Sequence, residues 1–157
     1  VTMGGIELGL PFIDRLQSLP YFFVLAGQQQ TKCVGTNILL LCRQDVFFHP
    51  DLVNAADLVV CKSGYSTIAE CYQAGARVCC VSRDIFPESK VVERFVKQEM
   101  NGSVISTDYF LSGNWLSNLG ELLSRKPVYR NVANGASEVA EFLIPLLSTH
   151  TRTTSTG

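Results

Sequence analysis

An apolar run that breaks into a loop of small residues constrains this 157-residue chain more than any other stretch. Leu58 to Cys61 is apolar without polar alternation, which is typical of a parallel strand covered on both faces. Lys62, Ser63 and Gly64 follow, and a helix is predicted over residues 67–74. Such a junction places unpaired N–H groups and the positive end of a helix above the sheet. It therefore predicts a cradle for a phosphate.

Two interpretations of Thr67 and Glu70 are open. The run from Thr67 to Glu70 matches a capping box, in which both side chains only cap their own helix. In the other interpretation Glu70, on the same side of the helix as Thr67, binds a ligand. The hydroxyls of Ser63, Ser66 and Thr67 and the cation of Lys62 would then complete a site for a diphosphate and a ribose diol.

The run from Asn54 to Gly75 resembles the donor-site signature of GT-B glycosyltransferases. It is similar to the signature of the peptidoglycan-precursor N-acetylglucosaminyltransferases and to the glycosyltransferase-like portion of plant L-arabinokinases. The resemblance implies that Glu70 binds the ribose hydroxyls of a UDP-sugar. It also implies that the backbone near Ser66 and Thr67 holds the phosphates.

Further donor-binding residues follow from the same resemblance. The amides of Gly4 and Gly5 would approach the donor phosphates, and the backbone around Phe48 and His49 would meet the nucleobase. His49 is not assigned as a catalytic base, because no orienting acid or metal partner lies beside it in the sequence.

The loop from Arg83 to Ser89 occupies the place where the family holds the donor sugar. The peptidoglycan enzyme has a glutamine pair there, whereas Glu88 and Ser89 are closer to the acidic pattern of the arabinokinase-type domains. Glu88 equally suits the first turn of the next helix. Arg83 has two possible partners, Asp84 and a donor phosphate.

The resemblance covers most of residues 1–147 and implies that they form one Rossmann-like, donor-binding half of a GT-B fold. Residues 148–157 have no apolar pattern and are rich in Thr and Ser, so we expect a disordered tail there. A missing N-terminal acceptor-binding domain is the implied partner. No catalytic residue, metal or cofactor is assigned, so we expect donor binding without appreciable sugar transfer. A non-catalytic nucleotide-sugar-binding or regulatory module, and an epimerase or hydrolase of a nucleotide sugar, stay open as alternatives.

Apolar strands alternate with helical patterns along the chain. Strands are predicted over 21–25, 38–41, 58–61, 77–81 and 104–105, and helices over 8–18, 51–55, 67–74 and 89–99. This order predicts an α/β, Rossmann-like three-layer domain with a parallel sheet of five or six strands. Ligands bind beyond the carboxyl ends of such strands. Helices over 112–124 and 133–147 are expected to cover the sheet.

The composition excludes several classes of function. A net charge of -1 and a charged fraction of 17% leave no electrostatic footprint for nucleic acid or acidic membranes. No apolar run reaches the roughly 18 residues of a membrane span, and no signal segment opens the chain. We therefore expect a cytoplasmic protein without a nucleic-acid partner.

The six cysteines are predicted to be small core residues. None of them has the spacing of a zinc site or a redox pair, and adjacent Cys79 and Cys80 should point to opposite faces of a strand. Neither a disulfide nor a metal site is expected.

Overall fold

The computed structural model describes residues 1–4, 10–83, 86–128 and 135–150, in which strands and helices alternate. The strands are β1 (Phe23–Gln28), β2 (Lys32–Val34), β3 (Ile38–Cys42), β4 (Leu58–Lys62), β5 (Arg77–Val81) and β6 (Ser103–Ile105). The helices are α1 (Ile13–Leu16), α2 (His49–Asn54), α3 (Tyr65–Ala74), α4 (Ser89–Glu99), α5 (Thr107–Leu111), the 3-10 helix η1 (Asn114–Asn118), α6 (Leu119–Ser124) and α7 (Gly135–His150).

The strands form two three-stranded sheets, in the orders β1-β3-β2 and β4-β5-β6. Pairing is parallel except between β2 and β3, which are antiparallel. Thr2 lies between the sheets and makes parallel bridges to Ala26 of β1 and Cys61 of β4. The Thr2 amide donates to the Val60 carbonyl at 2.9 Å, and the Ala26 amide donates to the Val1 carbonyl at 3.0 Å. The α/β prediction is confirmed, with the parallel strands shared between two sheets.

The order of the strands locates the crevice of the sheet. If the segment at Thr2 counts as the first strand, the order of the parallel strands is β3-β1-Thr2-β4-β5-β6, with the antiparallel β2 beyond β3 at the edge. This is the order of a doubly wound sheet, whose chain direction across the sheet reverses beside the first strand. Ligands of such sheets bind at that reversal, outside the carboxyl ends of the strands. Here the reversal lies between Thr2 and β4.

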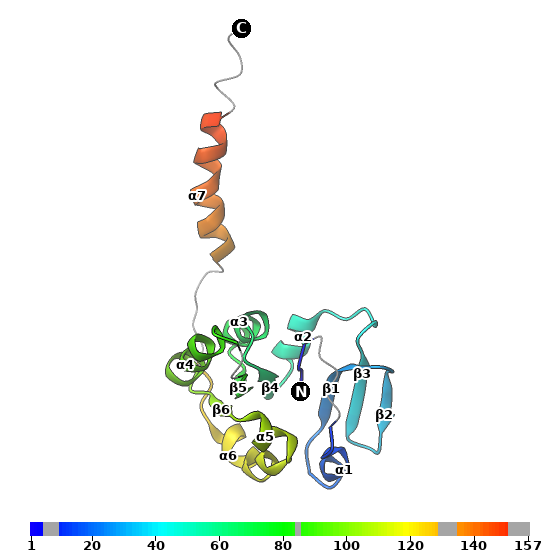
Figure 1. Cartoon of the computed structure of the whole chain (residues 1–157). Helices are drawn as coiled ribbons and strands as arrows, with labels where there is room; N and C mark the ends of the chain where they lie inside the picture. Colours follow the sequence, from blue (N-terminus) through cyan, green and yellow to red (C-terminus); the bar gives the residue numbers. More distant parts are fainter. Residues whose placement is uncertain (5–9, 84–85, 129–134, 151–157) are drawn as a thin grey trace.

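Helices lie on both sides of β4 and β5 (Figure 1), and two hydrophobic clusters join them to the strands. The first joins α1, α5, η1 and α6 to the sheet, and its aromatic centre is Phe12, Phe110 and Trp115. The second joins α2, α3 and α4 to β4 and β5. Along β5, Cys79 belongs to the first cluster and Cys80 to the second, as the alternation of a strand requires. Three layers result at β4 and β5.

Most predicted elements lie where the pattern placed them. Residues 77–81 and 89–99 have the predicted bounds, and residues 38–41 form β3 with one residue more. Residues 28–32 are polar and predict a loop or the start of a short helix, but in the structure β1 continues to Gln28 and the short antiparallel β2 begins at Lys32. Helix 8–18 is reduced to α1, and residues 5–9 lie outside the described part of the chain.

The predicted helix over residues 112–124 begins two residues later and is formed by η1 and then α6, which follow each other without a gap. Helix α5 ends at Leu111, before this range, and Gly113 separates it from η1 by taking a left-handed conformation with φ of +69°. A Cβ at Gly113 would lie 2.6 Å from the Cβ of Phe12. The break therefore lets α1 approach the chain closely, which a continuous helix would prevent.

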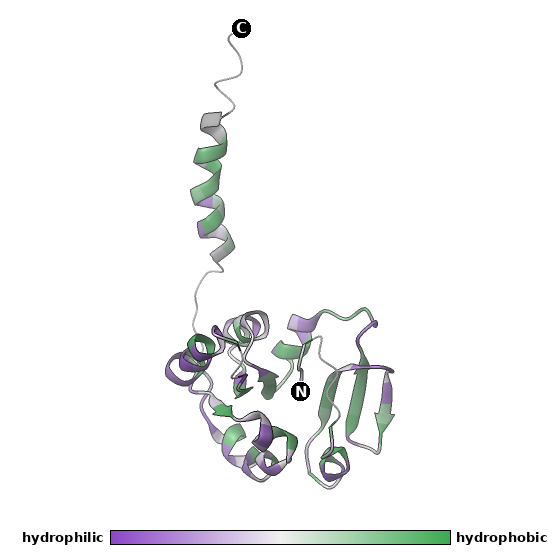
Figure 2. Ribbon diagram, viewed as in Figure 1, coloured by the Kyte–Doolittle hydropathy of each residue, from purple (hydrophilic) through white to green (hydrophobic). Residues whose placement is uncertain are grey.

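Helix α7 has the predicted amphipathic pattern but does not cover the sheet. Figures 1 and 2 show it standing away from the strands, with apolar residues along much of its length. Phe142 is 70% exposed and Leu147 is 68% exposed. The expectation that this helix closes the core is therefore wrong for the chain in this structure. The helix continues to His150, past the predicted boundary at Leu147.

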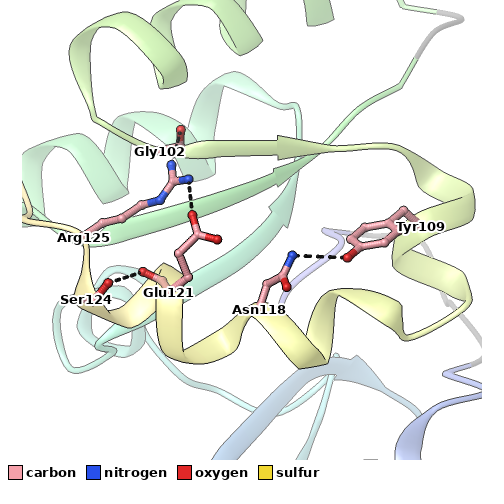
Figure 3. A network of polar contacts seen from close by, with 6 residues as sticks. All are labelled: Gly102, Tyr109, Asn118, Glu121, Ser124 and Arg125. Atoms are coloured by element: carbon pink, nitrogen blue, oxygen red, sulfur yellow. Dashed lines mark hydrogen bonds and ion pairs between the residues drawn. The ribbon is translucent and has the colours of Figure 1, made fainter.

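A polar network at the opposite edge from the crevice attaches α6 to the sheet (Figure 3). Arg125 donates to the carbonyl of Gly102 at 3.2 Å and to Glu121 at 2.8 Å. Arg77, the first residue of β5, donates to the carbonyl of Arg125 at 2.7 Å. These contacts satisfy carbonyls next to β6, so the network is structural.

All six cysteines are free thiols, and five of them are buried. Cys33 on β2 is exposed, which corrects the expectation that all six are core residues. Burial raises the pKa of Cys79 to about 12 and that of Cys80 to about 12. Among the residues that the structure describes, no helix is long and apolar enough to cross a membrane.

Candidate functional site

The predicted cradle (residues 62–67) lies at the carboxyl end of β4. Lys62 ends the strand, Ser63 and Gly64 form the turn, and α3 begins at Tyr65. Gly64 is the N-cap in an extended conformation, and no side chain caps the helix. The first amides of α3 therefore have no partner in their own helix and form the positive end of its dipole.

The helix start contradicts the capping-box interpretation of Thr67 and Glu70. The pattern requires Thr67 to precede the helix, but Thr67 is the third helical residue after the Gly64 N-cap. Glu70 lies in the middle of α3 and contacts another element instead. Neither Thr67 nor Glu70 therefore caps α3. Ser66 is exposed at the start of the helix.

Gly4 lies beside the cradle through its contact with Lys62. Gly4 has a φ of +60°, and a Cβ built on it would lie 2.7 Å from the Lys62 ammonium nitrogen. A Cβ on Gly64 would lie 3.7 Å from Cε of the same lysine. The structure therefore brings Gly4, Lys62 and Gly64 together at the strand reversal, while Gly5 lies outside the described residues.

His49 and Glu70 form a pair that the sequence pattern did not suggest. His49 Nδ1 lies 2.5 Å from Glu70 Oε2, and the two side chains are 28% and 27% exposed. His49 Nε2 lies 3.3 Å from Thr2 Oγ1. The expectation that His49 has no acidic partner is wrong, because α2 and α3 bring together residues that are far apart in sequence. A spacing rule could not have found this pair.

Ser63 and Ser89 are brought together, but away from solvent. Each is 1% exposed, and Ser63 Oγ donates to Ser89 Oγ at 2.9 Å. The bond joins the end of β4 to the start of α4. The two hydroxyls therefore position the cradle and the loop before α4 in this conformation.

The remaining predicted residues lie in the segments before α4 and α2. Arg83 lies over the ring of Phe86, with its guanidinium carbon 3.4 Å from the ring centroid. Asp84 lies outside the described residues, so the predicted ion pair with Arg83 does too. Glu88 is exposed at the N-cap position of α4 without a side-chain capping bond, and Phe48 is 67% exposed before α2.

A cavity of about 340 Å³ lies between the facing edges of β1 and β4, separate from the cradle. Its walls are mainly apolar and include Phe23, Leu58 and Trp115, and Thr2 and His49 lie on its wall. Lys62 and Gly64 do not line it. Its lining includes Asp57 but no lysine or arginine, so the cavity lacks the cationic side chain that Lys62 gives the cradle.

The described residues contain no cluster of three histidine, cysteine or acidic side chains that could hold a metal ion. The polar groups at the candidate site are an ammonium group at Lys62, the amides at the start of α3, the paired carboxylate of Glu70 and the carboxylate of Glu88. Such a set can neutralise an anion and accept hydrogen bonds from hydroxyls.

Comparison with known proteins finds one distant relative. The chain is 27% identical over 143 residues to L-arabinokinase of Arabidopsis thaliana. The match covers 91% of this chain but 14% of that protein. No family model matches the chain, and no solved structure gives a significant match. The chain is thus distantly related to one short part of a much longer protein.

Proposed function

We propose that this chain binds a nucleoside diphosphate sugar, a UDP-sugar in view of the resemblance, as the donor-binding half of a GT-B glycosyltransferase. The observation that carries the proposal is the position of Gly4, Lys62 and the first turn of α3 at the strand reversal. Glu70 follows one turn later in the same helix. An anion site and a carboxylate at this spacing suit a diphosphate and its ribose.

The diphosphate would be held by the amides of Tyr65, Ser66 and Thr67 and by the Lys62 ammonium. A helix of ten residues supplies about half a positive charge at its first turn. Donors fixed in this way also stabilise a departing diphosphate, because they need no rearrangement when negative charge develops. This is the contribution that the domain would make to sugar transfer.

Glu70 would accept hydrogen bonds from the ribose hydroxyls, and the backbone at Phe48 and His49 would meet the base. Glu88 is exposed and acidic, so it would bind hydroxyls of the donor sugar. Arg83 would bind a phosphate from the other side of the cradle. The buried pair of Ser63 and Ser89 would support the site without touching the donor.

Sugar transfer would require an acceptor-binding domain as partner. The Glu70 carboxylate orients the His49 imidazole through Nδ1, an arrangement that general bases also use, and Nε2 faces the Thr2 hydroxyl. Because the acceptor site belongs to the partner domain in this scheme, we propose that the chain alone binds the donor without appreciable transfer. Residues 1–147 would form this donor-binding domain.

A non-catalytic nucleotide-sugar-binding module is the second candidate. The relative is named a sugar kinase and not a glycosyltransferase, which favours a domain that binds a sugar nucleotide beside a different activity. The two candidates differ in the fate of the donor. A glycosyltransferase half releases UDP from the donor when its partner domain is present, and a binding module does not.

Calorimetric titration with UDP, GDP and dTDP tests the proposal. We expect saturable binding of UDP to the wild type, and a loss of roughly 1 to 3 kcal/mol in Glu70→Ala. Glu138→Ala on α7 is the matched control, because it removes an exposed carboxylate from a helix away from the strands. Equal affinities in wild type and Glu70→Ala would overturn the ribose contact, and no binding of any nucleotide would overturn the proposal.

A further inference from the structure

The side chain of His49 joins three separate elements at the crevice. Its Nδ1 lies 2.5 Å from Glu70 Oε2 of α3, and its Nε2 lies 3.3 Å from Thr2 Oγ1 of the bridging segment. His49 itself is the first residue of α2, followed by Pro50. Both ring nitrogens therefore have partners on elements other than their own.

The identity of the partners fixes the hydrogen on Nδ1. A carboxylate oxygen only accepts hydrogen bonds, so Nδ1 carries the hydrogen and donates the hydrogen bond to Glu70 Oε2. Nε2 faces a hydroxyl, which can donate to a neutral ring or accept from a charged one. The contact with Thr2 is thus compatible with either state of the ring, and it keeps Nδ1 directed at Glu70.

The bond to His49 leaves part of Glu70 free. Only Oε2 is engaged by the imidazole, and the carboxylate is 27% exposed. Each carboxylate oxygen has two acceptor positions, so Glu70 keeps capacity for the two hydroxyls of a cis-diol. A glutamate without this contact would sample several rotamers and would lose that freedom only when the ligand binds.

We propose that His49 is a positioning residue that holds the Glu70 carboxylate in the orientation that accepts a ribose cis-diol. It makes the site selective for ribonucleotides over nucleotides that lack the diol. This inference rests on the proposed function, and it adds a role for the His49 side chain beyond the backbone contact with the base.

Substitutions at His49 can separate positioning from general support of the fold. The amide nitrogen of Asn occupies nearly the position of Nδ1, so His49→Asn retains a donor to Glu70. His49→Ala removes the donor altogether. The pair of variants is matched, because both lose the ring and its contact with Thr2. Only the hydrogen bond to Glu70 distinguishes them.

The experiment measures the affinity of each variant for UDP and for 2′,3′-dideoxyuridine diphosphate by calorimetry. We expect His49→Ala to weaken UDP by about tenfold and to leave the dideoxy analogue unchanged, so that the preference for the diol disappears. His49→Asn should recover most of the preference for UDP over the dideoxy analogue. Thermal melts of both variants verify that the fold is retained.

Each other result counts against a specific part of the account. If both variants weaken UDP and the dideoxy analogue equally, His49 supports the fold and does not position Glu70. If Glu70→Ala weakens UDP but His49→Ala does not, the inference is wrong while the proposed function stands. If the wild type binds neither nucleotide, the proposed function is wrong, and the diol role of His49 with it.

Discussion

Two buried hydroxyls, those of Ser63 and Ser89, show how single residues hold the candidate site. The hydrogen bond between them joins the end of β4 to the first residue of α4. Their burial means that loss of one leaves the other without this partner in a site that water does not reach. A buried hydroxyl without a partner lowers the stability of the fold by more than one hydrogen bond between two hydroxyls raises it.

We predict that Ser63→Ala lowers the free energy of unfolding by about 1 to 3 kcal/mol. Removing both hydroxyls in Ser63→Ala/Ser89→Ala should cost less than the sum of the two single changes, because no unpaired hydroxyl remains. Urea denaturation of the four proteins measures this coupling. Additive effects would contradict the predicted bond, and the exposed Ser117→Ala serves as control.

Gly4 is a second residue whose conformation matters to the site. Its φ of +60° disfavours any side chain, and a Cβ would displace the Lys62 ammonium. We predict that Gly4→Ala lowers the free energy of unfolding by about 1 to 2 kcal/mol and moves Lys62. Gly120→Ala is the control, since nothing lies within 4 Å of its Cβ position inside α6. Equal unfolding free energies of the two variants would contradict this.

The buried thiols make stability depend on alkaline pH. Burial raises the pKa of Cys79 and of Cys80 to about 12 from an ordinary value of 9.0. The unfolded chain therefore loses these protons first, and stability that is present below pH 9 falls as the pH rises toward 12. The free energy of unfolding falls by up to about 1.4 kcal/mol per pH unit for each thiol.

Urea denaturation between pH 8 and pH 10.5 tests this dependence, with Cys80→Ala as the comparison. We expect the variant to lose less stability over this range than the wild type. A parallel pH dependence in the two proteins would show that other groups dominate. Thiol labelling in native buffer should meanwhile modify Cys33 rapidly and the five buried cysteines slowly.

At the scale of elements, helix α7 differs most from what its sequence led us to expect. Its apolar residues have helical spacing, which usually indicates a face packed on a core. In the structure that face is exposed, with Phe142 at 70% and Leu146 at 50%. Periodicity predicts the helix correctly, but it does not say which surface the helix packs against.

We predict that Phe142→Ser/Leu146→Ser changes the unfolding free energy of the sheet domain by no more than about 0.5 kcal/mol, as is usual for surface sites. Leu122→Ala in α6 is the matched comparison, because Leu122 is 5% exposed within the core. Leu122→Ala should lower the free energy of unfolding by about 2 to 5 kcal/mol. Strong destabilisation by the α7 substitutions would show that the helix packs on the domain in solution.

The sequence predicted local elements better than contacts between them. Strand β5 and helix α4 were predicted with their bounds, because apolar runs and helical spacing are local properties. The cradle was predicted from the same local pattern at residues 62–67. The pair of His49 and Glu70 was not, because it depends on how α2 and α3 pack. Two bonded serines likewise looked like ligand groups until their burial was known.

At the scale of the whole molecule, the proposed function depends on where the strand order reverses. Thr2 joins the two sheets and places Gly4 opposite the end of β4. Helix α3 begins at the same point and directs its first turn at the crevice. The predicted cradle is therefore at the position where doubly wound sheets bind ligands. The opposite edge carries the Arg125 network, which uses its polar groups for structure.

The measurement that tests this account most directly is a two-dimensional NMR titration of the ¹⁵N-labelled protein with UDP. We predict that the amide signals of Ser63 to Thr67 and of Glu70 shift in a saturable manner, while those of Arg77 and Gly102 at the opposite edge do not move. Shifts confined to the cavity between β1 and β4, or the absence of any shift at millimolar UDP, would contradict the central claim that the start of α3 binds a nucleoside diphosphate.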